Sequence, residues 1–108
     1  MSTDKSKARR DPVEVWPPAA YIEDELVARG WEPEYLLEAV GRTLQGKRGQ
    51  LAVLDVLEGK SMTRTAAAAL GTVFGTSSLL WLNLDAVWWE WLALRRKRAK
   101  EQESHESG

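Results

Sequence analysis

Apolar residues recur at intervals of three and four positions along most of this chain, which is the spacing that gathers side chains on one face of an α-helix. No segment alternates apolar and polar residues as a half-buried strand does. Glycine, proline and hydroxyl residues divide the pattern into five pieces. The pattern therefore predicts an all-α fold of five helices, near residues 18–29, 33–41, 50–58, 64–74 and from 78 onwards.

The residues between these segments are typical of helix starts and stops. Residues suited to a helix start open or precede four of the segments: Pro18, Pro33, Thr63 and Ser77. Glycines suited to a stop end or follow four of them: Gly30, Gly41, Gly59 and Gly75. Residues 42–49, which contain two glycines and three basic residues, are predicted to form an irregular connection before the third helix.

The two ends of the chain differ from its middle. Residues 1–12 have few apolar side chains and are predicted to be a disordered basic arm, in which Lys5, Lys7, Arg9 and Arg10 serve either as a DNA-groove contact or for solubility. The long fifth helix is expected to fray among residues 95–100, and residues 101–108 are expected to be disordered. We therefore divide the chain into the arm, a folded domain (13–94) and a charged C-terminal tail (95–108).

The residue types that metal binding and catalysis need are scarce. The chain has no cysteine, and its single histidine, His105, lies in the polar tail. We therefore expect no disulfide, no metal site, no cofactor, no small-molecule substrate and no enzymatic activity. The lack of cysteine and of an apolar leader in residues 1–12 favours a reducing, cytoplasmic location.

The formal net charge of −1 conceals a segregation of charge along the chain. Residues 11–40 hold eight acids against one arginine, whereas residues 41–64 hold five basic residues against two acids. Residues 95–100 add five more basic residues. Nucleic acid responds to local patches rather than to the sum, so the total charge neither excludes nor favours it as a partner.

Residues 65–84 contain no charge and are followed by tryptophans and a basic cluster, which is also the pattern of a membrane-spanning helix. Gly71 and residues 75–78 interrupt this run with signals typical of separate soluble helices. Asp85 and Glu90 place charges among the tryptophans, where lipid would penalise them. We therefore expect two separate helices here and no membrane partner.

Four segments of the chain, read in order, resemble a known family: residues 16–26, 28–31, 58–60 and 74–84. Together they are similar to the HigA-type antitoxins of the XRE helix-turn-helix family. The last segment is the most specific, because its Phe-Gly-Thr-Ser (74–77) and Trp-Leu-Asn-Leu (81–84) coincide with a family motif in residues and spacing.

This resemblance implies a five-helix, lambda-repressor-like helix-turn-helix domain that dimerises and binds operator DNA. It implies that the second and third helices form the helix-turn-helix and that the third enters the major groove. Family members repress their own operon and neutralise a partner toxin, and some relatives regulate phage or mobile elements. The expected partners are therefore double-stranded DNA, a second copy of this chain and a toxin protein.

We expect the DNA contacts to come from the third helix and from the residues that flank it. The candidates are Arg42, Lys47, Arg48, Gln50, Leu51, Leu54, Lys60 and Arg64. The basic residues would contact phosphate, while the three at 50, 51 and 54 stand where family members read bases. Gly46 and Gly49 are expected to let the connection approach the DNA backbone closely.

The same region departs from the family pattern. Glu32 and Pro33 stand where a hydroxyl cap and a glutamine are usual, the connection after Gly41 is longer than the family turn, and Asp55 replaces a common arginine. Residues 50–58 also hold more apolar side chains than one buried face requires, so some should be exposed or meet a partner. The alternative interpretation is a helix-turn-helix scaffold that binds a toxin or host factor without reading DNA sequence.

Four tryptophans lie on the fifth helix. Trp81, with Leu84, is expected in the core because it falls on the helical apolar stripe. Trp88, Trp89 and Trp91 extend beyond the surface that so small a domain is expected to cover. Large exposed aromatic residues are typical of protein interfaces, so these three are predicted to form a homodimer or toxin interface.

Overall fold

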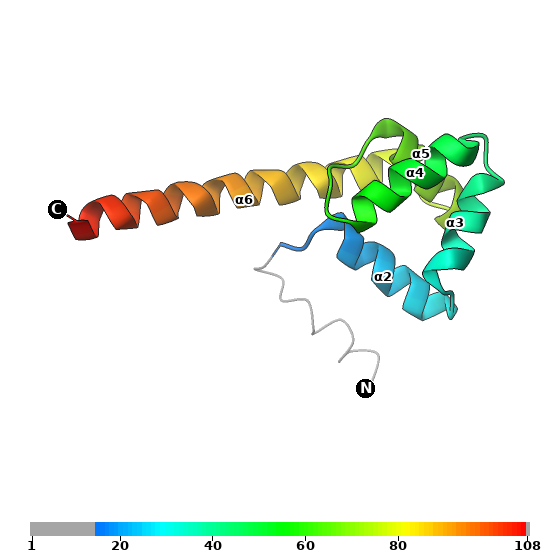
Figure 1. The fold of residues 1–108 in the computed structure, drawn as a ribbon, viewed down its shortest axis with the longest axis horizontal. Coiled ribbons are helices and arrows are strands. Elements are labelled where there is room, and N and C mark those ends of the chain that lie inside the picture. The colour runs from blue at the N-terminus through cyan, green and yellow to red at the C-terminus, as the bar shows by residue number, and fades with distance from the viewer. Residues whose placement is uncertain (1–14, 108) are drawn as a thin grey trace.

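The computed structural model describes the backbone of residues 15–107 and the side chains as far as Glu101. This range contains five helices and no strand (Figure 1), which confirms the predicted all-α fold. In chain order the helices are α2 (Pro18–Arg29), α3 (Pro33–Gly41), α4 (Gly46–Leu57), α5 (Arg64–Phe74) and α6 (Ser78–Ser107). The basic arm predicted for residues 1–12, with its four lysines and arginines, lies outside the described residues.

Local capping defines α5 and α6 as two separate helices. The Thr63 hydroxyl oxygen accepts a hydrogen bond of 3.1 Å from the Ala66 N–H, and the Ser77 hydroxyl oxygen accepts one of 3.1 Å from the Leu80 N–H. Gly75 between the helices adopts a left-handed conformation with φ of +75°. The uncharged run is therefore two helices, as predicted, and none of the described helices is long and apolar enough to cross a membrane.

The helix α4 begins four residues earlier than its sequence predicts. The connection from α3 is only residues 42–45, because Gly46 and Gly49 belong to α4. Gly49 is buried, and a Cβ atom added there would lie 3.1 Å from Val40 Cγ1 and 3.5 Å from Ala69 Cβ. Its missing side chain therefore allows α4 to pack closely on α3 and α5, which corrects the expectation that this glycine lies in a connection near DNA.

The helix α6 is also longer than predicted. It runs for 30 residues to Ser107, so residues 95–107 are helical where fraying and then disorder were expected. The lysine, arginine, glutamate and glutamine residues that fill this part are good helix formers. Thirty helical residues span about 45 Å, and Figure 1 shows the C-terminal half of α6 extending away from the other helices.

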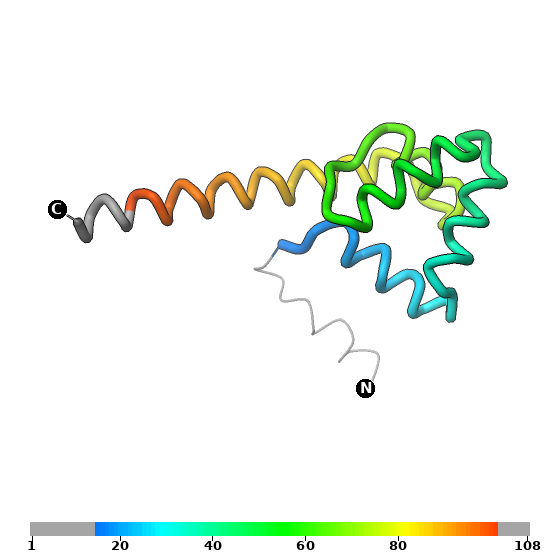
Figure 2. Tube along the Cα trace, in the orientation of Figure 1, coloured from blue at the N-terminus to red at the C-terminus, as the bar shows by residue number. Residues whose placement is uncertain are grey.

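The core lies where α5 meets α3, α4 and the first turns of α6, with α2 closing one side of α4 and α6. The tube in Figure 2 shows these short helices gathered around the beginning of α6. Trp81 is 2% exposed, which confirms its predicted place in the core, and Leu84 is half-buried at the edge. The buried apolar residues are Ile22, Leu26, Leu36, Val40, Val53, Val56, Met62, Ala66, Ala67, Ala69, Leu70, Phe74 and Trp81.

Candidate nucleic-acid interface

The helices α3 and α4 are joined by a short turn, so together they form a helix-turn-helix arrangement. The four residues between them are held by Thr43, whose hydroxyl donates to the Val40 carbonyl oxygen at 2.6 Å and accepts from the Gln45 N–H at 3.2 Å. Turns of three or four residues are typical of DNA-binding helix-turn-helix motifs. The connection is therefore not the long insertion that the sequence suggested.

Gln50 faces α3 and not solvent. Its side-chain Nε2 donates a hydrogen bond of 2.9 Å to the Leu37 carbonyl oxygen, and its side chain fills the space above Gly41. A Cβ atom on that glycine would overlap the Gln50 amide. The structure therefore places this predicted base reader in the contact between α3 and α4.

The opposite side of α4 is open to solvent. Val53 and Val56 point into the core, whereas the other side carries exposed residues at the three- and four-residue spacing of one helix face. We call the part of this surface nearest the turn the α4 face, made of Leu44, Lys47, Arg48, Leu51 and Leu54; Asp55 and Glu58 continue the same side toward the end of the helix. Four of its five members are residues that the sequence predicted for DNA contact. Leu44, in the turn, was missed because its full exposure depends on how the turn folds.

The basic residues of this region differ in whether a carboxylate already holds them. Arg42 pairs with Glu38 at 3.6 Å and Lys60 pairs with Asp55 at 3.5 Å, and both pairs are exposed. Within the described part of the chain, Lys47, Arg48 and Arg64 form no ion pair. Exposed ion pairs are weak, so a phosphate can compete for the paired residues, but the others are free to bind it at no such cost.

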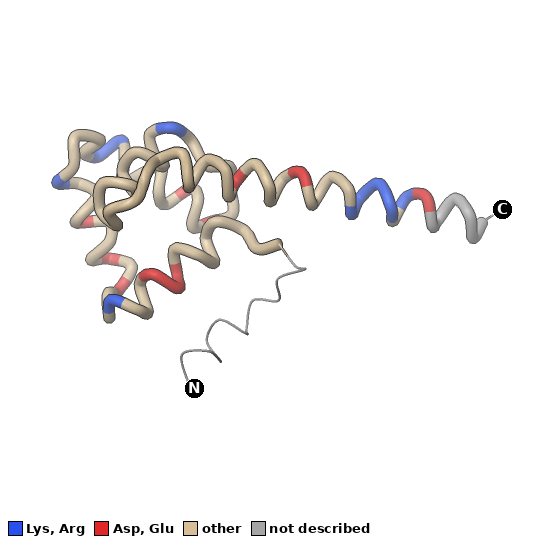
Figure 3. Tube along the Cα trace, turned by 180° about the vertical axis from the view of Figure 1, so that it is seen from behind, with Lys and Arg blue, Asp and Glu red and all other residues tan. Residues whose placement is uncertain are grey.

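The charges also segregate in space. Figure 3 shows acidic residues along α2 and α3, and basic residues near the start of α4 and along the second half of α6. Lys47 and Arg48 lie in the first turn of α4, while Lys60 and Arg64 flank its other end, about 18 Å away along a twelve-residue helix. The predicted basic residues are therefore split between the two ends of α4.

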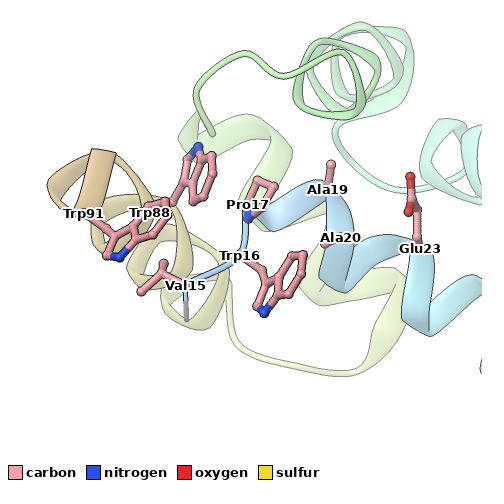
Figure 4. A pocket seen from close by; sticks show the side chains of 8 residues that line it. All are labelled: Val15, Trp16, Pro17, Ala19, Ala20, Glu23, Trp88 and Trp91. Atoms are coloured by element: carbon pink, nitrogen blue, oxygen red, sulfur yellow. The ribbon is translucent and has the colours of Figure 1, made fainter. Parts of the chain in front are cut away.

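Trp88, Trp89 and Trp91 are half-buried, which corrects the expectation that the domain leaves them uncovered. The rings of Trp88 and Trp91 stack with centroids 5.5 Å apart, and the Trp89 Nε1 donates to Asp85 Oδ1 at 3.0 Å. The chain just before and within α2 lies beside them and forms a pocket of about 440 Å³ (Figure 4). The residues that line it are Val15, Trp16, Pro17, Ala19, Ala20, Glu23, Trp88 and Trp91.

The apolar Val15-Trp16-Pro17 segment ahead of the first helix is the sequence signal that would have indicated this cover. The predicted interface role of the three tryptophans stays a prediction.

Among the described side chains, no group of three histidines or carboxylates is placed to hold a metal ion. Comparison with known protein families, with curated proteins and with solved structures finds no match to this chain.

Proposed function

We propose that this chain is a transcriptional regulator that binds operator DNA as a dimer, in the manner of the HigA-type antitoxins that its sequence resembles. The observation that carries the proposal is the exposed first turn of α4, where Lys47 and Arg48 are free of carboxylate partners directly after a four-residue turn from α3. In a helix-turn-helix protein the second helix of the pair enters the major groove with its N-terminal residues. Here that helix is α4.

The chemistry of the α4 face suits this role. Lys47 and Arg48 would contact phosphates or guanine edges, and the partial positive charge of the helix N-terminus would add to their attraction. Leu51 and Leu54 follow about one and two turns further along and would contact thymine methyl groups, which are the apolar feature of the major groove. Arg42 and Arg64 would contact phosphates on either side and fix the register of the helix.

The test is the affinity of the full chain for the DNA upstream of its own gene, measured by fluorescence anisotropy at two salt concentrations. The variant K47A/R48A is expected to bind at least about tenfold more weakly. The slope of its log affinity against log salt concentration should decrease by the amount that corresponds to about two phosphate contacts. The variant R96A/K100A removes the same charge from the distant part of α6 and is the control. Absence of binding by the unmodified chain at low salt, or an equal loss in both variants, would contradict the proposal.

A second candidate function is protein binding by the same face. Leu44, Leu51 and Leu54 are all exposed, and a cluster of large apolar side chains on one surface is typical of a site that meets a protein. The partner in this case would be a toxin or a host factor. The mixture of leucines with two basic residues suits an acidic partner surface.

A double leucine substitution tests the protein-binding candidate. The variant L51D/L54D should lose co-purification with the products of neighbouring reading frames, while circular dichroism shows an unchanged helix content. The variant V27D/L79D adds the same charge at exposed apolar positions outside the α4 face and should keep the partner. If no such product binds the unmodified chain, a toxin encoded beside this gene is rejected as the partner.

A further inference from the structure

The helix α6 carries apolar residues on more than the face it packs into its own domain. Its inner face includes Trp81, which is buried, and Trp88 and Leu92, which line pockets against the segment around Pro17 and Ala19. A second row of apolar residues runs along the flank of that face. We call this row the α6 stripe, and it consists of Leu80, Leu84, Val87, Trp91 and Leu94.

Much of the α6 stripe is open to solvent. Leu80 is 43% exposed, Val87 is 49% exposed and Leu94 is 57% exposed, and these three are spaced seven residues apart. Leu84 and Trp91 lie between them and are half-buried. The alternating spacing of four and three residues is the spacing of the core positions in a two-stranded coiled coil.

We propose that the α6 stripe is the interface of a parallel, two-stranded coiled coil formed with a second copy of this chain. In this heptad Leu80, Val87 and Leu94 occupy position d, and Leu84 and Trp91 occupy position a. The inference rests on the dimer of the proposed function and names the surface that forms it.

Charge complementarity identifies a second copy as the occupant. With the stripe as the core, Glu90 falls at position g and Arg95 falls at position e of the next heptad, five residues later. A parallel pair brings g of one helix opposite the following e of the other. Glu90 of each copy would therefore lie opposite Arg95 of the other, and the two-fold symmetry forms this pair twice.

The two charges are available for such a pair. Both side chains are exposed, and neither Glu90 nor Arg95 forms an ion pair within the described residues. The Arg95 guanidinium lies 4.9 Å from the centre of the Trp91 ring, which holds it beside the stripe. Figure 1 shows that α6 extends away from the other helices in this part, so a second α6 has room to lie alongside.

The proposed interface differs from the one that the sequence suggested. Trp88 and Trp89 pack within their own chain, while Trp91 contributes to both surfaces. After Leu94 the core positions become Arg98 and Glu101, so the apolar contact ends there. A parallel pair also puts both globular parts at the same end of the coiled coil, which is where two α4 faces must lie to reach adjacent half-sites of a symmetric operator.

The experiment is sedimentation equilibrium of the full chain without DNA. The unmodified chain is expected to be a dimer, and V87D/L94D is expected to dimerise at least about a hundredfold more weakly, because two carboxylates per helix would be buried in the core. The control A86D/A93D adds the same charge at the same spacing one position away, on the exposed side, and should remain a dimer. A monomeric unmodified chain, or a dimer that V87D/L94D leaves intact, would overturn the inference.

The orientation has its own test, because the native chain contains no cysteine. In a parallel pair the two copies of position 98 face each other, so R98C is expected to form a disulfide-linked dimer on mild oxidation, whereas A93C on the outer side is not. A dimer in which R98C fails to cross-link would reject the parallel arrangement. DNA affinity is measured separately with K47A/R48A, so a monomer that still binds DNA through α4 would overturn the coiled coil and not the DNA-binding role.

Discussion

The Gln50 side chain of α4 donates a hydrogen bond of 2.9 Å to the Leu37 carbonyl oxygen of α3. This bond joins the two helices of the candidate DNA-binding unit on the side away from the α4 face. Gln50 therefore contributes to the angle between the helices and not to the surface that would meet DNA.

We expect Q50M, which keeps the side-chain volume and removes the donor, to lower the free energy of unfolding by about 1 kcal/mol. Urea unfolding followed by circular dichroism measures this change. The affinity for DNA should change by less than about threefold, since no base contact is lost. A large loss of affinity with unchanged stability would instead mean that Gln50 reads bases.

Gly49 tests how closely α4 packs on its neighbours. An added Cβ would lie 2.6 Å from Gln45 Cβ and 3.1 Å from Val40 Cγ1, so side chains or helices must shift. We expect G49A to destabilise the fold by about 1–3 kcal/mol through overpacking, although alanine in a helix interior is otherwise favoured by roughly 0.5–1 kcal/mol. Thermal unfolding shows whether G49A lowers or raises the stability of the fold. An increase in stability would show that α4 has room for a methyl group beside α3 and α5.

Arg29 connects the end of α2 to the end of α5. Its guanidinium donates to the Phe74 carbonyl oxygen at 3.2 Å and lies 5.0 Å and 5.3 Å from the ring centres of Phe74 and Trp31. We expect R29K to cost about 1 kcal/mol in unfolding free energy, because lysine keeps the charge but loses the planar, stacked hydrogen-bonding group.

The matched control for that change is R42K. Arg42 makes only an exposed ion pair with Glu38, and such pairs contribute little, so the loss should stay below about 0.5 kcal/mol. If R29K and R42K lower the free energy of unfolding in urea by the same amount, the rings around Arg29 contribute no stability beyond that of an exposed ion pair.

Trp81 combines core packing with a specific hydrogen bond. Its Nε1 donates to the Thr76 hydroxyl oxygen at 2.8 Å, and its ring lies 5.8 Å from that of Phe74. We expect W81F to lower the free energy of unfolding by about 1–3 kcal/mol and T76A by about 1 kcal/mol, with the double variant losing less than the sum. The exposed control L79A should cost less than about 0.5 kcal/mol. Strict additivity of the two substitutions would mean that the hydrogen bond contributes nothing.

The helix ends illustrate what can be predicted from local sequence. Thr63 and Ser77 cap α5 and α6 as expected, and Gly30 and Gly75 stop the preceding helices with positive φ angles. Caps and left-handed stops act within a few residues, so the information needed to recognise them lies in the same short stretch of sequence. The number of helices and the burial of Trp81 followed from the same kind of information.

The start of α4 shows the opposite case. Gly46 and Gly49 look like helix breakers when only their neighbours in sequence are considered. Gly49 is nonetheless helical, because α4 packs closely against Val40 and Ala69 and this contact leaves little space for a side chain there. Trp88 is a similar case, since residues near Val15 and Pro17 fold beside it from the far end of the sequence.

The sequence by itself determined the helical class, the five helices and most of their ends, because apolar periodicity and capping are local properties. The tertiary structure decided which side of α4 is open, that Gln50 turns inward, and which flank of α6 is left uncovered. The physical reason is that the exposure of a side chain depends on segments far away in the sequence. Periodicity indicates that a helix has an apolar face, but only packing decides what covers it.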